Sequence, residues 1–450
     1  MNFKYALLGG IALLSLQSAN AAVSADEAKK LGTSLTPVGA EMAGNKDGSI
    51  PAYAGGLTTP PAGFDKASGV RPDPFAAEKP TLTITGKNME ASEGKLTEGT
   101  KELLKKHPDF RVDVFPTHRT VALPKNVQEN TLKNALRAKT SEGGLVLTDA
   151  FGGYPFPIPA TGYEAMWNHI LRYEGQAYKI KYTAMNVDSS GHAVVSTTGE
   201  IFEQYPYYDA SKTLESNSSD LYYQVKINYT GPSRRAGESL LVWESLNPIE
   251  KGRRAWQYLP GQRRVRLAPD IAYDTPNPGT AGSTTYDDAF TFNGAMDRYD
   301  FKLLGKKEMY VPYNMYRFEY GDPQKAATPN FANPDMVRWE LHRVWVVEAT
   351  LKPGTRHIYA RRVFYLDEDS WIAVASDEYD AKGGLFRSQF ATLAPSYDVP
   401  APFADSSIYY DFVAGSWGFS GLAGSNGIHY IDPLPEKDWT ADSLAAAGIR

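Results

Sequence analysis

From about residue 176 onward, apolar and polar residues alternate along most of the chain, and this period of two constrains the fold more than any other feature. The segment 337–351 shows the pattern best, because Trp339, Leu341 and Trp345 share one face while the other face carries mainly charged or polar residues. Such alternation is typical of β-strands with one buried face. The Lys-Pro-Gly-Thr sequence at 352–355 then matches a type II turn.

Similar turns divide residues 337–394 into four antiparallel strands, and the same alternation predicts strands earlier in the chain. These cover 177–187, 193–205, 221–230, 238–246, 254–259, 262–267, 299–304 and 310–320. About a dozen consecutive strands, without helices long enough for parallel crossovers, predict one large antiparallel sheet. A sheet of that size curls or splits. The predicted fold class is α+β and mainly antiparallel β.

Three helices are predicted before the strands, at 96–107, at 126–139 and from Thr161 onward. Asn126 with Glu129 is expected to form a capping box for the second helix, and Thr161 to cap the third. Short helices of this kind can cover the concave face of a curled sheet. We therefore expect a helical lid.

Residues 22–95 are rich in glycine and proline, for example at 48–51 and 72–74. A segment of this composition cannot build its own core, so we expect an extended arm over the main body. Residues 96–450 contain no internal repeat and no linker, which predicts a single domain.

Residues 1–21 have the three parts of a cleavable secretory signal: Lys4, an apolar run from Tyr5 to Leu16, and the small-x-small sequence Ala19-Asn20-Ala21. The chain has no cysteine, which excludes disulfides and thiolate metal sites and suits a bacterial periplasm. Its net charge of -5, from 47 basic and 52 acidic residues, is too balanced for a nucleic-acid binder. No later stretch is apolar for the roughly 18 residues of a membrane-spanning helix.

No motif in the sequence carries a recognisable chemistry. The glycine-rich run 415–421 misses the spacing of a nucleophile elbow and is expected to be a surface loop, and neither a Walker loop nor a dinucleotide fingerprint is present. None of the seven histidines has a second histidine at metal-ligand spacing. We therefore predict no enzyme activity, cofactor or metal, although a pair of catalytic carboxylates far apart in sequence stays open.

Aromatic residues are numerous, with 8 Trp, 28 Tyr and 19 Phe. They either fill the core or line a cavity between the sheet and the helices. For the cavity, the predicted wall residues are Trp243, Trp256, Tyr258, Trp339 and Trp345, and the predicted lid residues are Phe156, Ile158 and Trp167.

Basic residues concentrate in the predicted hairpin at 254–267. Arg264 and Arg266 lie on its polar side, opposite the face of Val265 and Leu267. This side is either a solvated face paired with acids or a surface for an anionic headgroup or a partner.

Four sequence segments resemble those of one bacterial family. They are DGSIPAYAGG at 47–56, ITGKNM at 84–89, YPFPIP at 154–159 with Trp167-Asn168-His169, and WQYLPGQRRVR at 256–266. Over essentially the whole mature chain, the sequence is similar to the "domain of unknown function 1329" family, whose members look like distant relatives of the periplasmic lipoprotein carriers LolA and LolB. The resemblance implies a half-barrel closed by helices around an apolar cavity. It also implies an RND-type exporter and an outer-membrane protein as partners, and it supplies no catalytic residues.

These observations predict a periplasmic carrier for a hydrophobic molecule or acyl chain, since each buried CH₂ contributes roughly 0.8 kcal/mol to binding. Two alternatives stay open. A periplasmic hydrolase would show two carboxylates across an open polar cleft, and a scaffold between inner- and outer-membrane partners would show a filled core.

Overall fold

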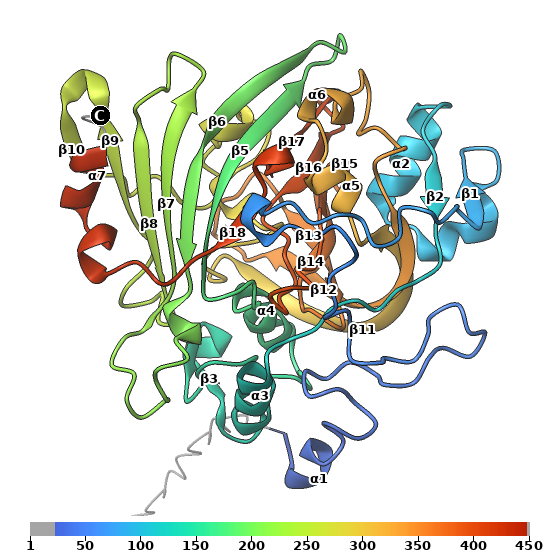
Figure 1. The fold of residues 1–450 in the computed structure, drawn as a ribbon, viewed down its shortest axis with the longest axis horizontal. Helices are drawn as coiled ribbons and strands as arrows, with labels where there is room; N and C mark the ends of the chain where they lie inside the picture. The colour runs from blue at the N-terminus through green and yellow to red at the C-terminus, as the bar shows by residue number, and fades with distance from the viewer. Residues whose placement is uncertain (1–22, 448–450) are drawn as a thin grey trace, which may run out of the picture.

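The structure, a computed structural model, describes residues 23–447 and shows one large curved sheet with short helices around it (Figure 1). The predicted signal peptide, residues 1–21, lies outside the described residues. Within residues 23–447, no helix combines the length and the apolar character that crossing a membrane requires.

Two consecutive meanders make up most of the sheet. The first meander consists of β5 (Ala177–Val187), β6 (Ala193–Gln204), β7 (Leu221–Gly231), β8 (Ser239–Ser245), β9 (Arg254–Leu259) and β10 (Arg264–Leu267). The second consists of β11 (Tyr299–Pro312), β12 (Trp339–Leu351), β13 (Arg361–Asp367), β14 (Ala373–Tyr379), β15 (Leu385–Ala391), β16 (Ser407–Asp411) and β17 (Ser416–Leu422). Each strand pairs antiparallel with the next in its meander.

The two meanders become one sheet because β17 pairs antiparallel with β5, with Phe419 opposite Met185. The strands β1 (Leu82–Ile84), β2 (Val112–Val114) and β18 (Ile428–Tyr430) extend the sheet, whereas β3 (Lys139–Ser141) and β4 (Val146–Thr148) form a separate hairpin. Among the described residues the main sheet has 16 strands, and its two ends do not pair with each other. The predicted fold class, a large curled antiparallel sheet with a few helices, is confirmed.

Two parts of the strand prediction are wrong. The segments 299–304 and 310–320 were expected as two strands, but β11 runs through both as far as Pro312, with a bulge at Gly305, whose φ is 102°. The run 415–421 is not a surface loop but β17. A Cβ at Gly418 would lie 2.4 Å from the hydroxyl oxygen of Tyr409, so the glycine allows the close approach of β16.

The three predicted helices are confirmed as α2 (Glu98–Lys106), α3 (Lys125–Arg137) and α4 (Gly162–Ile170). Thr161 caps α4, since its hydroxyl accepts a hydrogen bond from the Glu164 amide at 3.2 Å. The capping box at Asn126 is wrong, because α3 starts at Lys125 after Pro124 and has no side-chain cap. The remaining helices of the described residues are α1 (Ala25–Ala28), α5 (Tyr316–Glu319), α6 (Pro323–Ala326) and α7 (Ala441–Ala447).

The N-terminal segment up to residue 95 contains α1, β1 and short 3-10 turns, and it runs along the outside of the molecule (Figure 1, blue). It is tied to the turn after β13, because the Trp371 indole donates a hydrogen bond to the Val38 carbonyl at 2.9 Å. The Glu41 amide likewise donates to the carboxylate of Glu368 at 3.2 Å. The segment is therefore fastened to the second meander by specific polar contacts.

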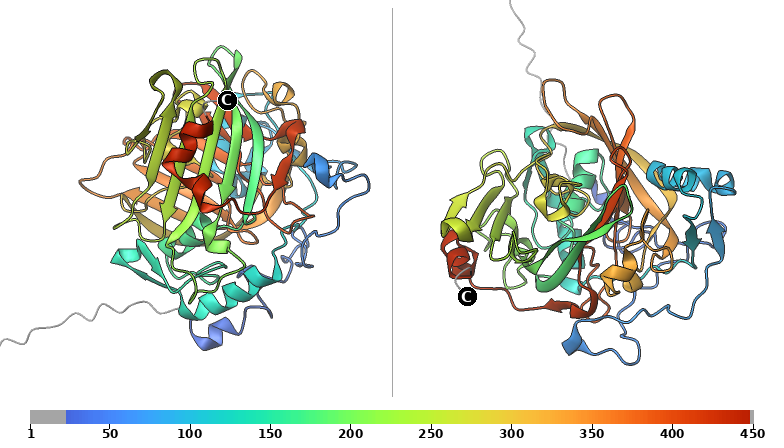
Figure 2. Two further views of the ribbon diagram at one scale, coloured as in Figure 1. Left: turned by 60° about the vertical axis from the view of Figure 1, so that its left-hand side comes forward. Right: turned by 90° about the horizontal axis from the view of Figure 1, so that it is seen from above.

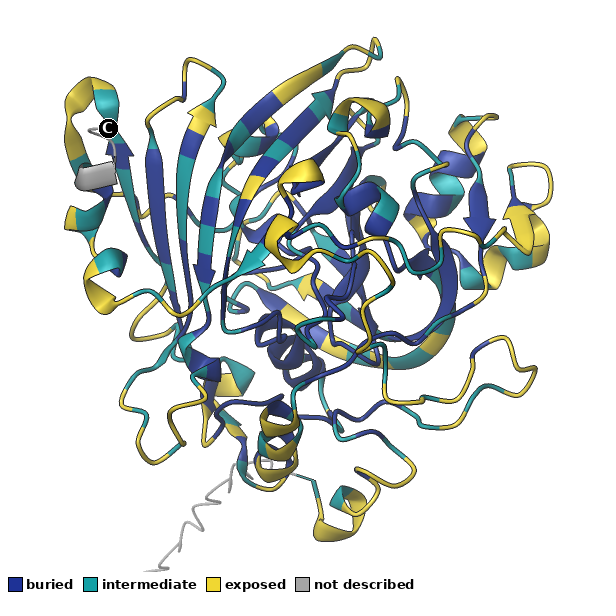
Figure 3. Cartoon of the chain, viewed as in Figure 1, coloured by how far each residue is buried: buried dark blue, intermediate teal, exposed yellow. Residues whose placement is uncertain are grey.

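Helices cover the two meanders differently. Helix α4 is buried almost throughout (Figure 3). It packs on the inner face of the second meander, where Met166 and Ile170 join the same hydrophobic cluster as Val347 and Phe364. On the first meander, α7 lies across the outer face of β8 to β10 (Figure 2). The inner face of the first meander is covered by a long irregular connection, residues 271–293, which we call the cover segment.

Candidate ligand-binding site

A cavity of about 170 Å³ lies between the first meander and the cover segment. Alternate residues of the strands form its wall, because in a strand every second side chain points to the same face. On β7 these are Tyr223, Val225, Ile227 and Tyr229. Leu240 and Val242 of β8, Ile201 of β6, and Tyr182 and Ala184 of β5 complete this side. The strand wall is therefore mainly apolar and aromatic.

The cover segment closes the other side of the cavity with Ile271, Tyr286 and Phe290. Its Asp288 is fixed from the second meander, since Arg362 of β13 donates to the carboxylate at 2.8 Å and the Tyr359 hydroxyl donates to it at 2.8 Å. Ala289 is exposed and also lines the cavity, so the cavity reaches the surface beside the anchored part of the cover segment.

Asp287 strengthens this anchor. Its carboxylate accepts a hydrogen bond from the His357 ring at 3.0 Å and lies 3.5 Å from a guanidinium nitrogen of Arg362. Burial alone would raise the pKa of Asp287, but the charge of Arg362 and the bond from His357 hold this pKa well below its usual range. The cover segment is thus held by ionised, fully buried groups.

Two acidic side chains, Glu203 of β6 and Asp405, line one end of the cavity. The Glu203 carboxylate accepts hydrogen bonds from the hydroxyls of Tyr178, Tyr205 and Tyr223 at 2.6, 3.0 and 3.0 Å. Burial, reinforced by the charge of nearby Glu174, raises the pKa of Glu203 to about 7. Burial and the charge of Glu203 raise the pKa of Asp405 well above its usual value. No hydrogen-bond donor to the Asp405 carboxylate is found among the described residues.

A single arginine lies behind these acids. The guanidinium of Arg172 donates to Glu174 at 2.9 Å and stacks on the ring of Phe290 at 3.7 Å, while its Nη2 has no hydrogen-bond partner among the described residues. Glu174 is bonded to this guanidinium, and Glu203 and Asp405 are close enough to interact with its charge. This excess of acid groups makes the end of the cavity favour hydrogen-bond donors and positive charge.

A second hollow of about 210 Å³ lies beyond Arg253, which borders both spaces. The guanidinium of Arg253 is fixed between them, since it donates to Glu244 at 2.5 Å and to the carbonyls of Tyr286 and Asn293. Trp167 and Ile170 of α4 line this second hollow. Trp167, one of the three predicted lid residues, thus borders a space next to the cavity.

The structure places the predicted wall residues of the first meander outside the cavity. Trp243, Trp256 and Tyr258 lie on the outer face of β8 and β9, in one cluster with Trp439 and Leu444 of the C-terminal segment. The predicted strands are present, but their inner face is formed by the residues next to these aromatic side chains, such as Leu240 and Val242. The large aromatic rings pack beneath α7, and this contact could not be read from the strand pattern.

The other predicted residues are also separate from the cavity. Trp339 packs against Phe390 in the outer cluster of the second meander, and Trp345 stacks on Trp371. Phe156 and Ile158 border a groove beside the N-terminal residues Val23, Ser24 and Glu27. Helices therefore do not form the lid of the cavity, and the cover segment takes that position.

Arg264 and Arg266 lie on β10 and are both exposed. Arg266 donates a hydrogen bond to Gln257 on the neighbouring strand at 3.2 Å. Neither arginine lines the cavity.

Sequence reasoning missed most of the residues that line the cavity. The alternation of Tyr223, Val225, Ile227 and Tyr229 was visible, and it could have identified the inner face of β7. No local signal identified Asp405, which the fold brings to Glu203 from a distant part of the chain.

Comparison with known proteins identifies the family. Residues 83–445 match the model of a family described as "Protein of unknown function (DUF1329)". The chain belongs to the DUF1329 family. A relative from Pseudomonas aeruginosa, "Uncharacterized protein PA3922", is 41% identical over 464 residues, which cover 99% of both chains.

Three solved structures are similar to this DUF1329 protein. A domain from Vibrio parahaemolyticus named for outer membrane lipoprotein sorting has a TM-score of 0.43 and 16% identity, and the match covers 63% of this chain and 97% of that one. A DUF1329 family protein from Desulfovibrio piger has a TM-score of 0.41 and 15% identity, over 60% and 91%. The LolA superfamily protein NE2245 from Nitrosomonas europaea has a TM-score of 0.37 and 11% identity, over 63% and 100%.

Proposed function

We propose that this DUF1329 protein is a periplasmic carrier that holds a hydrophobic molecule in the cavity between the first meander and the cover segment. The observation that supports the proposal is the contrast in packing. The inner face of the second meander is filled by α4, whereas the inner face of the first meander borders a space of about 170 Å³ with a mainly apolar wall. Binding and release need no bond to be made or broken.

The size of the cavity limits the part of the ligand that it can hold. An apolar cavity of about 150 Å³ can bind benzene. The space of about 170 Å³ therefore accommodates a group of roughly that size, with the rest of a longer ligand at the exposed rim near Ala289. A longer acyl chain would also need the second hollow of about 210 Å³, which Arg253 separates from the first.

The acidic end of the cavity selects the polar end of the ligand. Glu203 and Asp405 offer carboxyl oxygens, and among the described residues Arg253 is the one basic side chain that lines the cavity, where it is bonded to Glu244. An alcohol or an ammonium group can donate to these oxygens, and an ammonium group would favour the ionised form of both acids. A carboxylate or a phosphate would be repelled by ionised Glu203 and would bind only beside protonated acids. We therefore propose an apolar ligand that ends in a hydrogen-bond donor.

Binding of a matched series tests this proposal. Calorimetric titration at pH 7.5 with octylamine, octanol and octanoate should give saturable binding of the amine or the alcohol and at least about tenfold weaker binding of octanoate, a difference of about 1.4 kcal/mol. Val225→Phe, which places a ring in the cavity, should abolish binding. Val413→Phe, at an exposed position, should leave binding unchanged. Absence of saturable binding, or equal binding by Val225→Phe, contradicts the proposal.

Delivery of the ligand is part of the same proposal. The export-system partners implied by the sequence resemblance would either take the ligand from the carrier or load the ligand into the carrier. We propose the exposed pair Arg264 and Arg266 as a contact surface for such a partner or for an anionic headgroup. Exchange of both residues for glutamine should weaken capture by the exporter and leave octylamine binding unchanged.

A hydrolase is the second candidate, because two carboxyl groups, Glu203 and Asp405, share one end of the cavity and affect each other's ionisation. Their pKa values are pushed upward, as for an acid catalyst. Incubation with octyl esters and octyl glucosides distinguishes the candidates. A carrier returns these compounds intact, whereas a hydrolase releases octanol and loses this activity in Glu203→Gln.

A further inference from the structure

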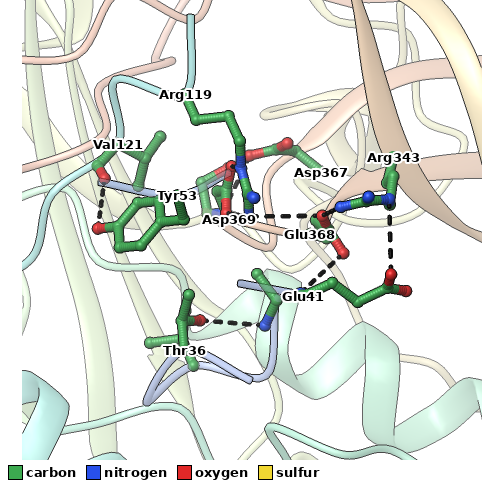
Figure 4. Close-up of polar contacts among 12 residues, drawn as sticks. Thr36, Glu41, Tyr53, Arg119, Val121, Arg343, Asp367, Glu368 and Asp369 are labelled. Carbon is green, nitrogen blue, oxygen red and sulfur yellow. Dashed lines mark hydrogen bonds and ion pairs between the residues drawn. The ribbon is translucent and has the colours of Figure 1, made fainter. Parts of the chain in front are cut away.

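A second polar centre lies in the second meander, where the turn after β13 meets β12. His342 of β12, Asp367 at the end of β13 and Asp369 in the turn each place one potential ligand atom within 4.8 Å of the others. Figure 4 shows Asp367 and Asp369 of this group. The pairing of Val344 with Asp367 places His342 on the same face of the sheet as Asp367, two residues along β12. All three residues are buried.

Asp367 carries the first indication of a ligand. One of its carboxylate oxygens, Oδ2, accepts hydrogen bonds from the Ser370 amide, the Ser370 hydroxyl and the Tyr313 hydroxyl at 3.0, 2.6 and 3.2 Å. The other, Oδ1, receives no hydrogen bond from any described residue, although the side chain is fully buried. A buried carboxylate oxygen without a donor is rare in native proteins, and a bound cation would give this atom a partner.

The ring of His342 is oriented by a carboxylate, as is usual for metal-binding histidines. Its Nε2 lies 2.9 Å from the carboxylate of Glu340, and its ring stacks on Tyr313 at a centroid distance of 3.6 Å. A hydrogen bond from one ring nitrogen to a carboxylate fixes the tautomer and leaves the other nitrogen as a ligand. In this arrangement Nδ1 of His342 is the available nitrogen.

The ion pairs around the turn after β13 distinguish Asp367 from its two acidic neighbours, Glu368 and Asp369. Asp369 is bonded by both oxygens to Arg119, at 2.7 and 2.9 Å (Figure 4). Glu368 pairs with Lys306 at 2.8 Å and with Arg343 at 3.1 Å. Among the described residues, no lysine or arginine forms an ion pair with Asp367. A cation beside Asp367 would therefore complete the pairing of the whole cluster.

We propose that His342, Asp367 and Asp369 bind a divalent transition-metal ion, with Zn²⁺ as the preferred ion, and that this ion fastens the turn to β12. One imidazole and two carboxylates suit Zn²⁺, whereas Mg²⁺ and Ca²⁺ prefer oxygen ligands alone. Each oxygen of Asp369 keeps a lone pair beside its bond to Arg119. The proposal is independent of the carrier function.

Metal analysis of the full chain tests this site. After treatment with a chelator and removal of the chelator, the chain is titrated with Zn²⁺ or Mg²⁺, and bound metal is measured by elemental analysis after gel filtration. We expect one Zn²⁺ per chain, no retained Mg²⁺ and a higher Tm with Zn²⁺. His342→Gln should weaken Zn²⁺ binding by more than about 100-fold. His192→Gln, at an exposed histidine, should leave the binding unchanged.

Co²⁺ provides a readout that does not depend on the stability of a variant. Co²⁺ bound to the wild-type chain should give visible absorption bands of a site with nitrogen and oxygen ligands, and Zn²⁺ should displace it. If His342→Gln does not fold, Asp367→Asn serves as the second variant and should also lose the Co²⁺ spectrum. Failure of the wild-type chain to retain either ion, or equal retention by a folded His342→Gln, overturns the proposal.

Discussion

The first and second meanders belong to one sheet and have the same alternating sequence, but their inner faces have different surroundings. In the second meander, α4 packs directly on the strands, and Met166, Trp371 and Phe364 fill the space between them. In the first meander, the irregular cover segment crosses the strands and leaves about 170 Å³ beside Val225 and Tyr229. The regular helix fits the sheet closely, whereas the irregular segment does not.

Buried acids also differ between the anchor of the cover segment and the end of the cavity. In the anchor, Asp288 pairs with Arg362, and nearby in the turn after β13 Asp369 pairs with Arg119. At the end of the cavity, Glu203 and Asp405 share the guanidinium of Arg172 with Glu174. Removal of one partner of a buried ion pair leaves an uncompensated charge, so such a pair holds together the segments that it joins. Carboxyl groups that outnumber their basic partners are suited to bind a hydrogen-bond donor on a ligand.

The largest effect is expected when the anchor of the cover segment is broken. Arg362→Met removes a fully buried guanidinium and leaves Asp287 and Asp288 without their partner. The loss should lower the free energy of unfolding by about 3–5 kcal/mol, measured by urea denaturation at pH 7.5. The exposed Arg264→Met is the control and should change this free energy by less than about 0.5 kcal/mol. A change below about 1 kcal/mol for Arg362→Met would show that the anchor does not hold the cover segment.

The pH dependence of the unfolding free energy should distinguish Glu203, at the end of the cavity, from Asp287, in the anchor of the cover segment. Burial raises the pKa of Glu203 to about 7, above its value of 4.5 in the unfolded chain. The protonated form is therefore favoured by folding, and its contribution to stability is complete below about pH 4.5 and lost as the pH rises through about 7. Glu203→Gln does not titrate, so from pH 5 to pH 8 it should gain about 2.5 kcal/mol in unfolding free energy relative to the wild type.

Asp287→Asn is the matched control for this pH experiment. The pKa of Asp287 is held below its usual range despite burial, because Arg362 and His357 favour its ionised form. Its contribution to stability is present above the pKa of the unfolded chain and is lost only as the pH falls through the lower pKa of the folded state. The difference between Asp287→Asn and the wild type should therefore stay constant from pH 5 to pH 8. Parallel pH profiles for both variants would mean that the two groups of acids do not differ.

The sequence predicted the elements well because alternation, turns and caps are local properties. It could not tell which face of β8 is internal, because that depends on α7 and the cover segment, which lie far away in sequence. Trp243 and Trp256, the predicted wall residues, pack instead with Trp439 on the outer face. The acids at the end of the cavity, Glu203 and Asp405, are about two hundred residues apart, and only the closure of β17 on β5 brings them together.

The smallest effect concerns two valines on the inner faces, Val225 of β7 and Val347 of β12. Val347 is fully buried against α4, so Val347→Phe forces extra atoms into a filled core and should cost about 1–3 kcal/mol in unfolding free energy. Val225 borders the cavity, so the ring in Val225→Phe enters existing space and should leave stability unchanged or raise it slightly. Thermal and urea unfolding of both variants measure this difference. Equal destabilisation by the two substitutions would mean that the first meander is packed as tightly in solution as the second, and the space proposed for the ligand would not exist.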